Sequence, residues 1–394
     1  MSKSKGLLPR SEITDKLERA DTLEGYKRFL SQDLVMNKMQ AWNGVFGFAD
    51  SLDGIVSPDY SVFRVVADID PRFFTYLFKT DLYAGVFGQL ARGMGTAFLR
   101  LNTDAFGSVD VPLPTALEQR SIANFLDKQT ARIDALIAEK QRLASSVREH
   151  EQAQISSLLT AGVDAPVLVP TGRDFIPAAP KHWRVVALKR ALRGLGQGWS
   201  PQCDNRPAEP GEWGVLKVGC VNGTTFDANE NKALPSTLEP DLTCVLKRGD
   251  VLVSRANTRE LVGSAALVDG DFPNLLLCDK LYRLDLREDW VLPEFAVLVL
   301  RSDVSRRQIE LGAGGASSSM QNISQDVLRD LVVALPPVTE QDEIVTKARQ
   351  MRLMCGDLVQ HVHEHIDRLR EYRSSLISAA VTGQLDIGTF KVAA

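Results

Sequence analysis

The chain carries two copies of one sequence pattern, and this duplication constrains its fold more than any other feature. Pro71 recurs as Pro293, 222 residues later, and Pro114 recurs at the same spacing as Pro336. Toward the N-terminus of each copy the spacing shortens to 219 and then to 217 residues, as loop-length changes between two copies of one domain would produce. A chain of 394 residues also exceeds one ordinary core. The sequence therefore predicts two domains of one design. Further pairs at the spacing of 222 are Phe73 and Phe295, Asp81 and Asp303, Gly93 and Gly315, Ile122 and Ile344, and Thr160 and Thr382.

Each copy has the same predicted order of elements. In the second copy, residues 250–255 and 279–286 are short β-rich runs bounded by Gly, Asn and Asp. One helix is expected from Pro293 to about Leu311, and in the first copy from Pro71 to about Leu90, because proline suits the first turn of a helix. A Gly/Ser-rich loop at residues 312–322, a short strand at 330–335 and a Pro-Pro stop follow.

A long helix is predicted after the proline stop of each copy. No Gly or Pro occurs between residues 117 and 161, and apolar residues recur at spacings of three, four and seven. Forty-odd residues make a rod of roughly 65 Å. Such a helix cannot bury its apolar stripe alone, so the two helices are expected to pack together. The expected seam joins Ile133, Leu136, Leu143 and Val147 to Leu358, Ile366 and Leu369.

The expected fold class is α+β, with two mixed β-rich domains joined by a pair of long antiparallel helices and an internal pseudo-twofold repeat. The antiparallel arrangement rests on the duplication and on the Pro-rich segment at residues 166–180, which suits a stiff linker. The expected parts are a first domain at 1–115, a first spacer helix at 116–162, a second domain at 163–338, and a second spacer helix with its tail at 339–394. Residues 174–217 have no counterpart in the first copy, so the first domain is expected to lack its N-terminal part.

The order of these pieces resembles the specificity subunits of type I restriction–modification enzymes. The resemblance is carried by residues 112–137 (PLPTALEQRSIANFLDKQTARIDALI) and by their echo at 335–344 (LPPVTEQDEI). It is carried also by residues 376–386 (LISAAVTGQLD) and 180–189 (PKHWRVVALK). The resemblance implies a non-catalytic subunit whose two target-recognition domains read the halves of a bipartite site in double-stranded DNA. It implies as partners two adenine-N6 methyltransferase (modification) subunits and a restriction subunit with motor and nuclease activity.

Candidate DNA contacts lie in two predicted loops of the second copy. Arg255, Asn257 and Arg259 follow a predicted strand, and their side chains can make bidentate contacts to base edges. The Gly/Ser-rich loop can place backbone N–H groups and polar side chains against phosphates. An ordinary polar turn and a flexible loop explain the same residues without DNA, so both interpretations remain open. The remaining candidates are Ser317, Ser318, Gln321 and Asn322 in that loop, and Lys38, Gln40, Asn43 and Arg92 in the first copy.

Candidate docking residues for the partner subunits are the Glu-Gln pairs that open the two long helices. These are Glu118 with Gln119 and Glu340 with Gln341. The pairs are singled out by the family resemblance and by their exact recurrence in the two copies.

The composition of the chain limits the classes of protein and of site that are expected. The net charge of −4 lacks the basic excess of a protein that grips DNA alone, so a partner is expected to supply much of the phosphate affinity. Five scattered cysteines without a CxxC pair fit neither a disulfide framework nor a zinc site, and they fit a reducing cytoplasm. No membrane span, metal site, cofactor or catalytic motif is expected. The alternative interpretation is a helical-hairpin scaffold whose domains bind protein instead of DNA.

Overall fold

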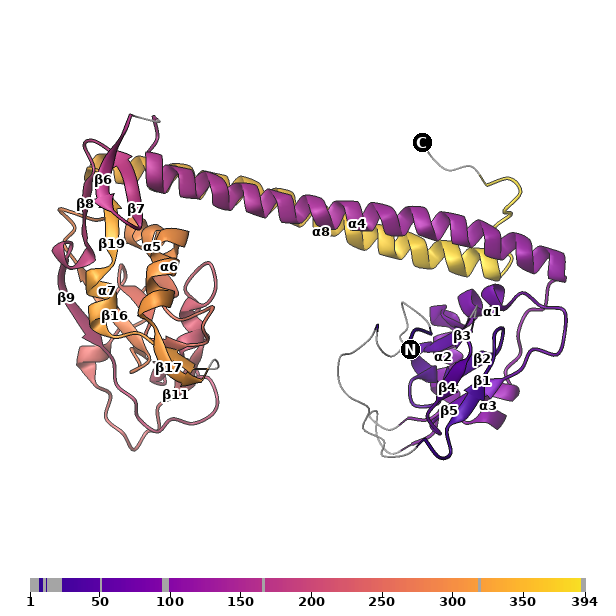
Figure 1. The fold of residues 1–394 in the computed structure, drawn as a ribbon. Helices are drawn as coiled ribbons and strands as arrows, with labels where there is room; N and C mark the ends of the chain where they lie inside the picture. The colour runs from indigo at the N-terminus through magenta and orange to yellow at the C-terminus, as the bar shows by residue number, and fades with distance from the viewer. Residues whose placement is uncertain are drawn as a thin grey trace. The chain divides into compact units, whose positions relative to one another are not determined.

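The computed structural model describes residues 7–9, 12, 23–49, 52–93, 99–164, 167–317 and 320–390. The chain divides into two compact units, coloured along the chain in Figure 1. The first unit comprises residues 1–144 and 360–394, and the second comprises residues 145–359. Each unit therefore combines one β-rich globular part with about half of each long helix, α4 (Ala116–Ala161) and α8 (Val338–Val381).

The second unit is built from short strands around three compact helices. The helices are α5 (Pro293–Arg301), α6 (Asp303–Gly312) and α7 (Gln325–Asp330). The strands are β6 (Leu168–Arg173), β7 (Ile176–Pro180), β8 (Arg184–Ala187), β9 (Leu192–Gln197), β10 (Gly214–Leu216), β11 (Asn231–Ala233), β12 (Val251–Ser254), β13 (Ala256–Asn257), β14 (Ala265–Leu267), β15 (Leu275–Leu276), β16 (Leu281–Leu286), β17 (Gly314–Ser317), β18 (Met320–Asn322) and β19 (Val332–Leu335).

The core of the second unit lies between a four-stranded antiparallel sheet and α5. The sheet has the order β14-β12-β16-β9. All four residues of β12 are buried, as expected of a central strand that is covered on both faces. Phe295 on α5 is fully buried in the same cluster as Val251 and Val253. Two smaller assemblies flank this sheet, β11-β10-β15 and the antiparallel pair β19-β8.

The first unit repeats this design with fewer strands. Its strands are β1 (Lys27–Phe29), β2 (Leu34–Asn37), β3 (Phe46–Phe48), β4 (Gly54–Val56) and β5 (Tyr60–Phe63), and its short helices are α1 (Pro71–Phe78), α2 (Asp81–Leu90) and α3 (Thr103–Gly107). The antiparallel sheet β3-β2-β5 corresponds to the centre of the larger sheet. Its core is aromatic: the ring of Phe46 lies 5.4 Å from that of Phe78 and 5.1 Å from that of Phe87, centroid to centroid.

One backbone contact relates the two copies residue by residue. The amide of Leu101 donates to the carbonyl of Lys38 at 2.9 Å, and the amide of Ile323 donates to the carbonyl of Arg255 at 3.0 Å. Lys38 and Arg255 are 217 residues apart, whereas Leu101 and Ile323 are 222 apart. The two shifts read from the sequence therefore describe one repeated tertiary contact.

The single helix expected in the middle of each copy is two helices in the structure. In the first unit, Thr80 is extended between α1 and α2, and its hydroxyl accepts from the amide of Tyr83. In the second unit, Ser302 takes the same conformation between α5 and α6 and caps the amide of Ser305. The expectation was wrong because the apolar pattern continues through a residue whose hydroxyl starts a new helix.

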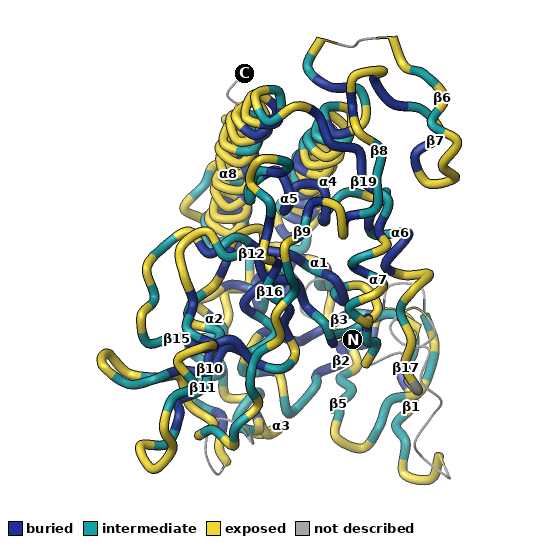
Figure 2. The backbone as a smooth tube through the Cα atoms, turned by 90° about the vertical axis from the view of Figure 1, so that its left-hand side faces the viewer, coloured by how far each residue is buried: buried dark blue, intermediate teal, exposed yellow. Residues whose placement is uncertain are grey.

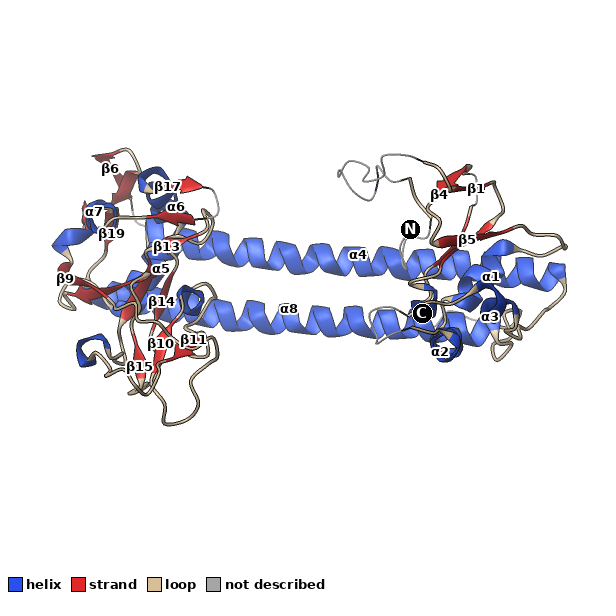
Figure 3. Ribbon diagram, turned by 90° about the horizontal axis from the view of Figure 1, so that it is seen from below, coloured by secondary structure: helices blue, strands red, loops and turns tan. Residues whose placement is uncertain are grey.

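The two long helices pack antiparallel within each unit (Figure 1, Figure 3). In the first unit, Asp134 on α4 pairs with Arg373 on α8 at 2.9 Å, whereas Phe125, earlier on α4, contacts Phe390 beyond the end of α8. In the second unit, Glu151 lies 3.9 Å from Arg352, and the end of α4 reaches the start of α8. Both orders are antiparallel, so the expected fold class is confirmed.

The seam between the helices differs from the expected one. Ile133 and Ile366 are buried as expected, but Leu136, Leu143 and Leu358 are 46%, 43% and 47% exposed. From residue 119 to residue 133 the buried positions of α4 fall at spacings of four and three and include small and polar residues. The two polar ones face the globular part: Gln119 binds the amide of Asp70, and the hydroxyl of Thr130 lies 3.3 Å from that of Tyr76. Much of α8 is coloured as exposed in Figure 2. The first buried positions of α4 are Gln119, Ala123, Leu126, Thr130 and Ile133.

Candidate nucleic-acid interface

The two candidate DNA-contact loops of the second copy come together in one small sheet. Residues 312–322 were expected to be an irregular loop, but they form the antiparallel strands β17 and β18. Strand β18 also pairs with β13, so that Asn257 lies opposite Gln321 and Ala256 lies opposite Asn322. We call Asn257, Gln321 and Asn322 on this sheet, together with Arg255 just before β13 and Arg259 in the turn after it, the recognition surface, because these are the residues expected to contact DNA.

The backbone of the recognition surface is held from both sides. The amide of Arg255 donates to the carbonyl of Lys280, and the amide of Ile323 donates to the carbonyl of Arg255. The guanidinium of Arg255 is half-buried and donates to the carbonyl of Asp279 at 3.1 Å. Asn257 donates from Nδ2 to Asn222 at 2.8 Å, whereas Arg259 is exposed. The Oδ1 of Asn257 also accepts from the amide of Thr258 at 2.9 Å, so this amide is held within the chain. The surface thus combines an exposed and an anchored guanidinium with three amide side chains, residue types suited to base edges and phosphates.

Two of the candidate serines fall at the limit of the described residues. Ser317 ends β17, but its side chain lies outside the described part of the chain, and Ser318 lies wholly outside it. Their expected role against phosphates stays a prediction.

Several cationic residues next to the recognition surface were missed from the sequence. Lys217, Lys232 and Lys280 line a hollow of about 220 Å³ together with Trp199. Lys280 is exposed and follows Asp279, whose carbonyl binds the Arg255 side chain. The sequence separates these lysines by up to 63 positions, and no local pattern links them. Only the pairing of strands brings them together.

The first unit presents a smaller counterpart of the same surface. Lys38 is held by Leu101 as described above, and Gln40 and Asn43 are exposed in the turn that follows β2. Arg92 is exposed and its backbone pairs with Arg100, which the sequence analysis did not single out. The counterpart loop between these two arginines includes residues 94–98, which lie outside the described residues.

The glutamines of the two Glu-Gln pairs are internal clamps and do not present their side chains to a partner. Gln119 is buried, accepts from the amide of Asp70 at 2.9 Å and donates to the carbonyl of Pro114 at 2.7 Å. Gln341 is buried, accepts from the amide of Leu292 at 2.9 Å and donates to the carbonyl of Pro336 at 2.9 Å. The repeated dipeptide therefore encodes a joint between each globular part and its long helix. Their buried side chains are already occupied in the isolated chain, and the docking role of the pairs stays a prediction.

The glutamates of the same pairs have diverged. Glu118 is exposed and forms a capping box with Thr115, whose hydroxyl and amide both donate to its Oε2 at 2.8 Å. These hydrogen bonds hold the pKa of Glu118 below its usual value. Glu340 is mostly buried and binds His182 at 2.7 Å and the indole Nε1–H of Trp183 at 3.2 Å. Glu118 thus remains a docking candidate, whereas Glu340 is already engaged inside its own unit.

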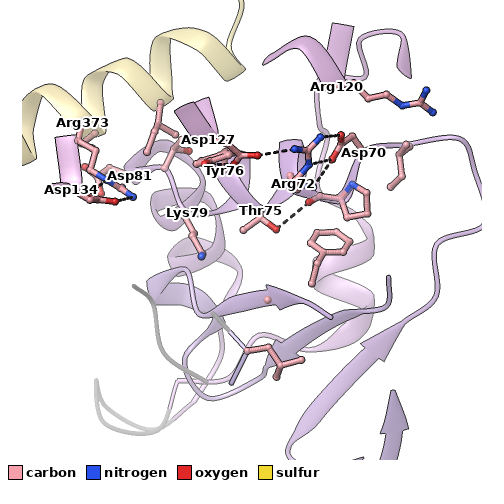
Figure 4. Close-up of a pocket in the computed structure, with 18 of the residues that line it drawn as sticks. Asp70, Arg72, Thr75, Tyr76, Lys79, Asp81, Arg120, Asp127, Asp134 and Arg373 are labelled. Atoms are coloured by element: carbon pink, nitrogen blue, oxygen red, sulfur yellow. Dashed lines mark hydrogen bonds and ion pairs between the residues drawn. The ribbon is translucent and has the colours of Figure 1, made fainter. Parts of the chain in front are cut away.

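A groove of about 1220 Å³ lies in the first unit between α1 and the long helices (Figure 4). Arg72 crosses it and pairs with Asp70 and Asp127, both at 2.7 Å. Although burial acts to raise the pKa of Asp70, the hydrogen bonds from the Arg72 side chain and backbone hold it below its usual value. Tyr76 donates to Asp127 at 2.7 Å, and burial raises the pKa of Tyr76 to about 12. The polar groups of Asp70, Arg72, Tyr76 and Asp127 bind one another, and these contacts fix α1 on α4.

Two kinds of feature are absent from the described residues. None of the described helices has the length and hydropathy needed to cross a membrane. Within the described ranges, no three His, Cys, Asp or Glu side chains gather as a metal ion would require.

The fold belongs to a known architectural class. The structure is similar to a chain in a solved structure titled for complex assembly and conformational transition of the type I R-M system, with a TM-score of 0.71. The similarity covers 93% of this chain and 85% of that one, at 18% sequence identity, so it shows a shared fold. No protein-family model matches the sequence.

Curated relatives define the class more closely. The chain is 26% identical over 340 residues to the Escherichia coli K12 type I restriction enzyme EcoKI specificity subunit, covering 84% of this chain and 68% of that protein. It is 32% identical over 194 residues to the Escherichia coli EcoEI specificity subunit, covering 48% of this chain. The matched part spans only about a third, 32%, of the EcoEI subunit's own length. The chain is a homologue of type I restriction enzyme specificity subunits.

Proposed function

We propose that this chain is the DNA sequence-recognition subunit of a type I restriction–modification complex. It reads a bipartite site with its two globular parts and docks the subunits that carry out the chemistry. The observation that carries the proposal is the duplicated architecture, with equivalent donor-rich loops in both copies, in a homologue of specificity subunits. The protein itself is non-catalytic in this proposal, and its substrate is double-stranded DNA.

The recognition surface is proposed to contact base edges. Asn257 lies opposite Gln321 on paired strands, Arg255 directly precedes β13, and Arg259 lies in the turn that follows β13. The pairing keeps Asn257, Gln321 and Asn322 in fixed positions relative to one another. A rigid donor array favours discrimination because a mismatched base leaves donors without acceptors. The neighbouring lysines are proposed to bind phosphates and to set the register on the duplex.

Partner subunits are proposed to dock on the exposed apolar residues of the long helices. In the second unit, Leu353 and Met354 are 63% and 73% exposed. In the first unit, Leu136 and Leu143 lie two helical turns apart on one face of α4, and both are partly exposed. Covering these apolar side chains with a partner removes them from water, and this burial stabilises the complex. One patch on each unit supports two methyltransferase subunits per chain, with a restriction subunit joining the complex.

The decisive experiment methylates a randomised DNA library with the assembled complex and compares Arg255→Ala with Arg248→Ala. Arg248 is an exposed arginine at the opposite end of β12, so it controls for the loss of one positive charge. We expect Arg255→Ala to relax one position of one half-site by about 1–3 kcal/mol and Arg248→Ala to leave the preference unchanged. Equal effects of the two substitutions would contradict the assignment of Arg255.

A second measurement separates this proposal from the scaffold alternative. In gel shifts at physiological salt, the isolated chain is expected to bind specific DNA poorly, and the complex with methyltransferase subunits is expected to bind it tightly. The reason is the net charge of −4, which leaves most phosphate neutralisation to the partners. A complex that methylates DNA without sequence preference would support the scaffold.

A further inference from the structure

An apolar edge lies open in the first unit, immediately before α4. Residues 109–113 form no strand and pair with no described strand. Val111 is 36% exposed and Leu113 is 70% exposed. Their counterparts in the second unit, Val333 and Leu335 of β19, are 1% and 2% exposed. The same sequence position is therefore core in one copy and surface in the other.

The second unit shows what covers this edge. Strand β8 runs antiparallel to β19, with Val186 opposite Val333 and Arg184 opposite Leu335. The amide of Leu188 extends the ladder by donating to the carbonyl of Leu331 at 2.8 Å. Strand β8 comes from the segment 174–217, which has no counterpart in the first copy. The open edge thus corresponds to the edge that β8 covers in the second unit, and no described strand of the first unit covers it.

The glycine that follows each long helix shows an independent difference between the two units. Gly162 follows α4, and a Cβ built there would lie 3.2 Å from the ring of Trp183 and 2.6 Å from Glu340. Gly383 is the equivalent residue after α8, with φ of 75° against 76° for Gly162. No described atom lies within 4 Å of a Cβ built at Gly383. The space that Trp183 fills in the second unit is open in the first.

The backbone of the edge is compatible with pairing. In an antiparallel ladder alternate residues direct their N–H and C=O groups to the same neighbour. Because the backbone carbonyl of Leu331 accepts a hydrogen bond from Leu188, the backbone N–H and C=O groups of residues 333 and 335 also point toward β8. The backbone groups of residue 334 point away from β8. Pro112 stands at the position of Ala334, so its missing N–H removes no bond from an incoming strand.

We propose that residues 109–113 are a docking site for a β-strand equivalent to β8. The docking strand has the sequence pattern Trp-Arg-Val-Val-Ala-Leu, and its tryptophan anchors it. The occupant is a polypeptide segment outside these 394 residues. Residues 1–22 contain no aromatic side chain, and β8 itself is paired within the second unit. Docking completes the first globular part, and it does so whether or not the chain recognises DNA.

The test uses the full chain and a fluorescein-labelled synthetic peptide with the sequence of residues 179–191. We expect one peptide to bind per chain and to protect the amides of Val109, Val111 and Leu113 from hydrogen exchange. The amides of residues 331–335 should exchange as before. The double variant Val111→Lys and Leu113→Lys should weaken binding at least about tenfold, because two buried apolar contacts are lost. Both residues are exposed in the free chain, so these substitutions leave folding intact.

Control peptides and the oligomeric state decide the occupant. A peptide carrying Trp183→Ala should bind at least about tenfold more weakly than the parent, whereas a scrambled peptide should not bind. Absence of binding, binding unaffected by the double variant, or protection confined to the second unit would overturn the proposal. A concentration-dependent dimer that Leu113→Lys abolishes would overturn the choice of occupant, since a second copy would then fill the edge.

Discussion

Removing the Gln341 clamp should destabilise the second unit selectively. The side chain is fully buried, accepts from the amide of Leu292, and donates to the carbonyls of Trp290 at 2.8 Å and Pro336 at 2.9 Å. In Gln341→Ala the Leu292 amide loses its acceptor inside the protein, which costs about 1–3 kcal/mol. The two carbonyls and the small cavity add about 1 kcal/mol more. The free energy of unfolding should therefore fall by about 3 kcal/mol.

Tryptophan fluorescence reports this change in one unit. Four of the five tryptophans lie in the second unit, and Trp42 alone lies in the first. In a urea titration Gln341→Ala should shift the fluorescence midpoint by about 1 M, given an m-value of about 2–3 kcal/mol/M. The equivalent Gln119→Ala should shift that midpoint far less, and the exposed Asp342→Ala should leave it in place.

An isosteric variant tests the role of the donated hydrogen bonds. Gln341→Glu keeps the shape but replaces the Nε2 donor with a carboxylate oxygen that faces two carbonyls. Burial raises the folded-state pKa of such a carboxyl above its unfolded value, so the penalty is largest at neutral pH and shrinks as pH falls below the folded pKa. A Gln341→Ala midpoint shift below about 0.2 M, or a Gln341→Glu stability that is independent of pH between 5 and 8, would refute the clamp.

Three further predictions concern other parts of the structure. Trp183→Phe should cost the second unit about 2–3 kcal/mol in urea titrations, because it removes the hydrogen bond to Glu340 and leaves a small cavity in place of the five-membered ring of the indole. Leu353→Lys with Met354→Lys should abolish co-elution with methyltransferase subunits and leave thermal unfolding unchanged, whereas loss of folding would count against the patch as a docking surface. The lowered pKa of Asp70 contributes stability above its unfolded pKa that is lost as pH falls below about 4, so Asp70→Asn should flatten the acid limb of first-unit unfolding.

Local sequence determined the long helices, the first turns of α1 and α5, and the repetition of one design. The absence of Gly and Pro from residue 117 to 161 predicts one long helix, and α4 spans Ala116–Ala161. Prolines 71 and 293 mark the first turns of α1 and α5 as expected. The duplication predicted that both units share one design, because the same local preferences recur in the same order. These signals are short-range, so they can be read without knowing the fold.

Tertiary structure alone decided how side chains are used. Gln119 and Gln341 look like surface residues at the start of a helix, and only the approach of residues 70 and 292 makes them buried clamps. The recognition surface joins residues 255–259 to 321–322 through a strand pairing that no local pattern encodes. On α4, Ala123 and Thr130 are buried while Leu136 is 46% exposed, because burial depends on which face of the helix other elements cover and not on hydrophobicity alone. Partners distant in the sequence are chosen by packing, and packing exists only once the chain has folded.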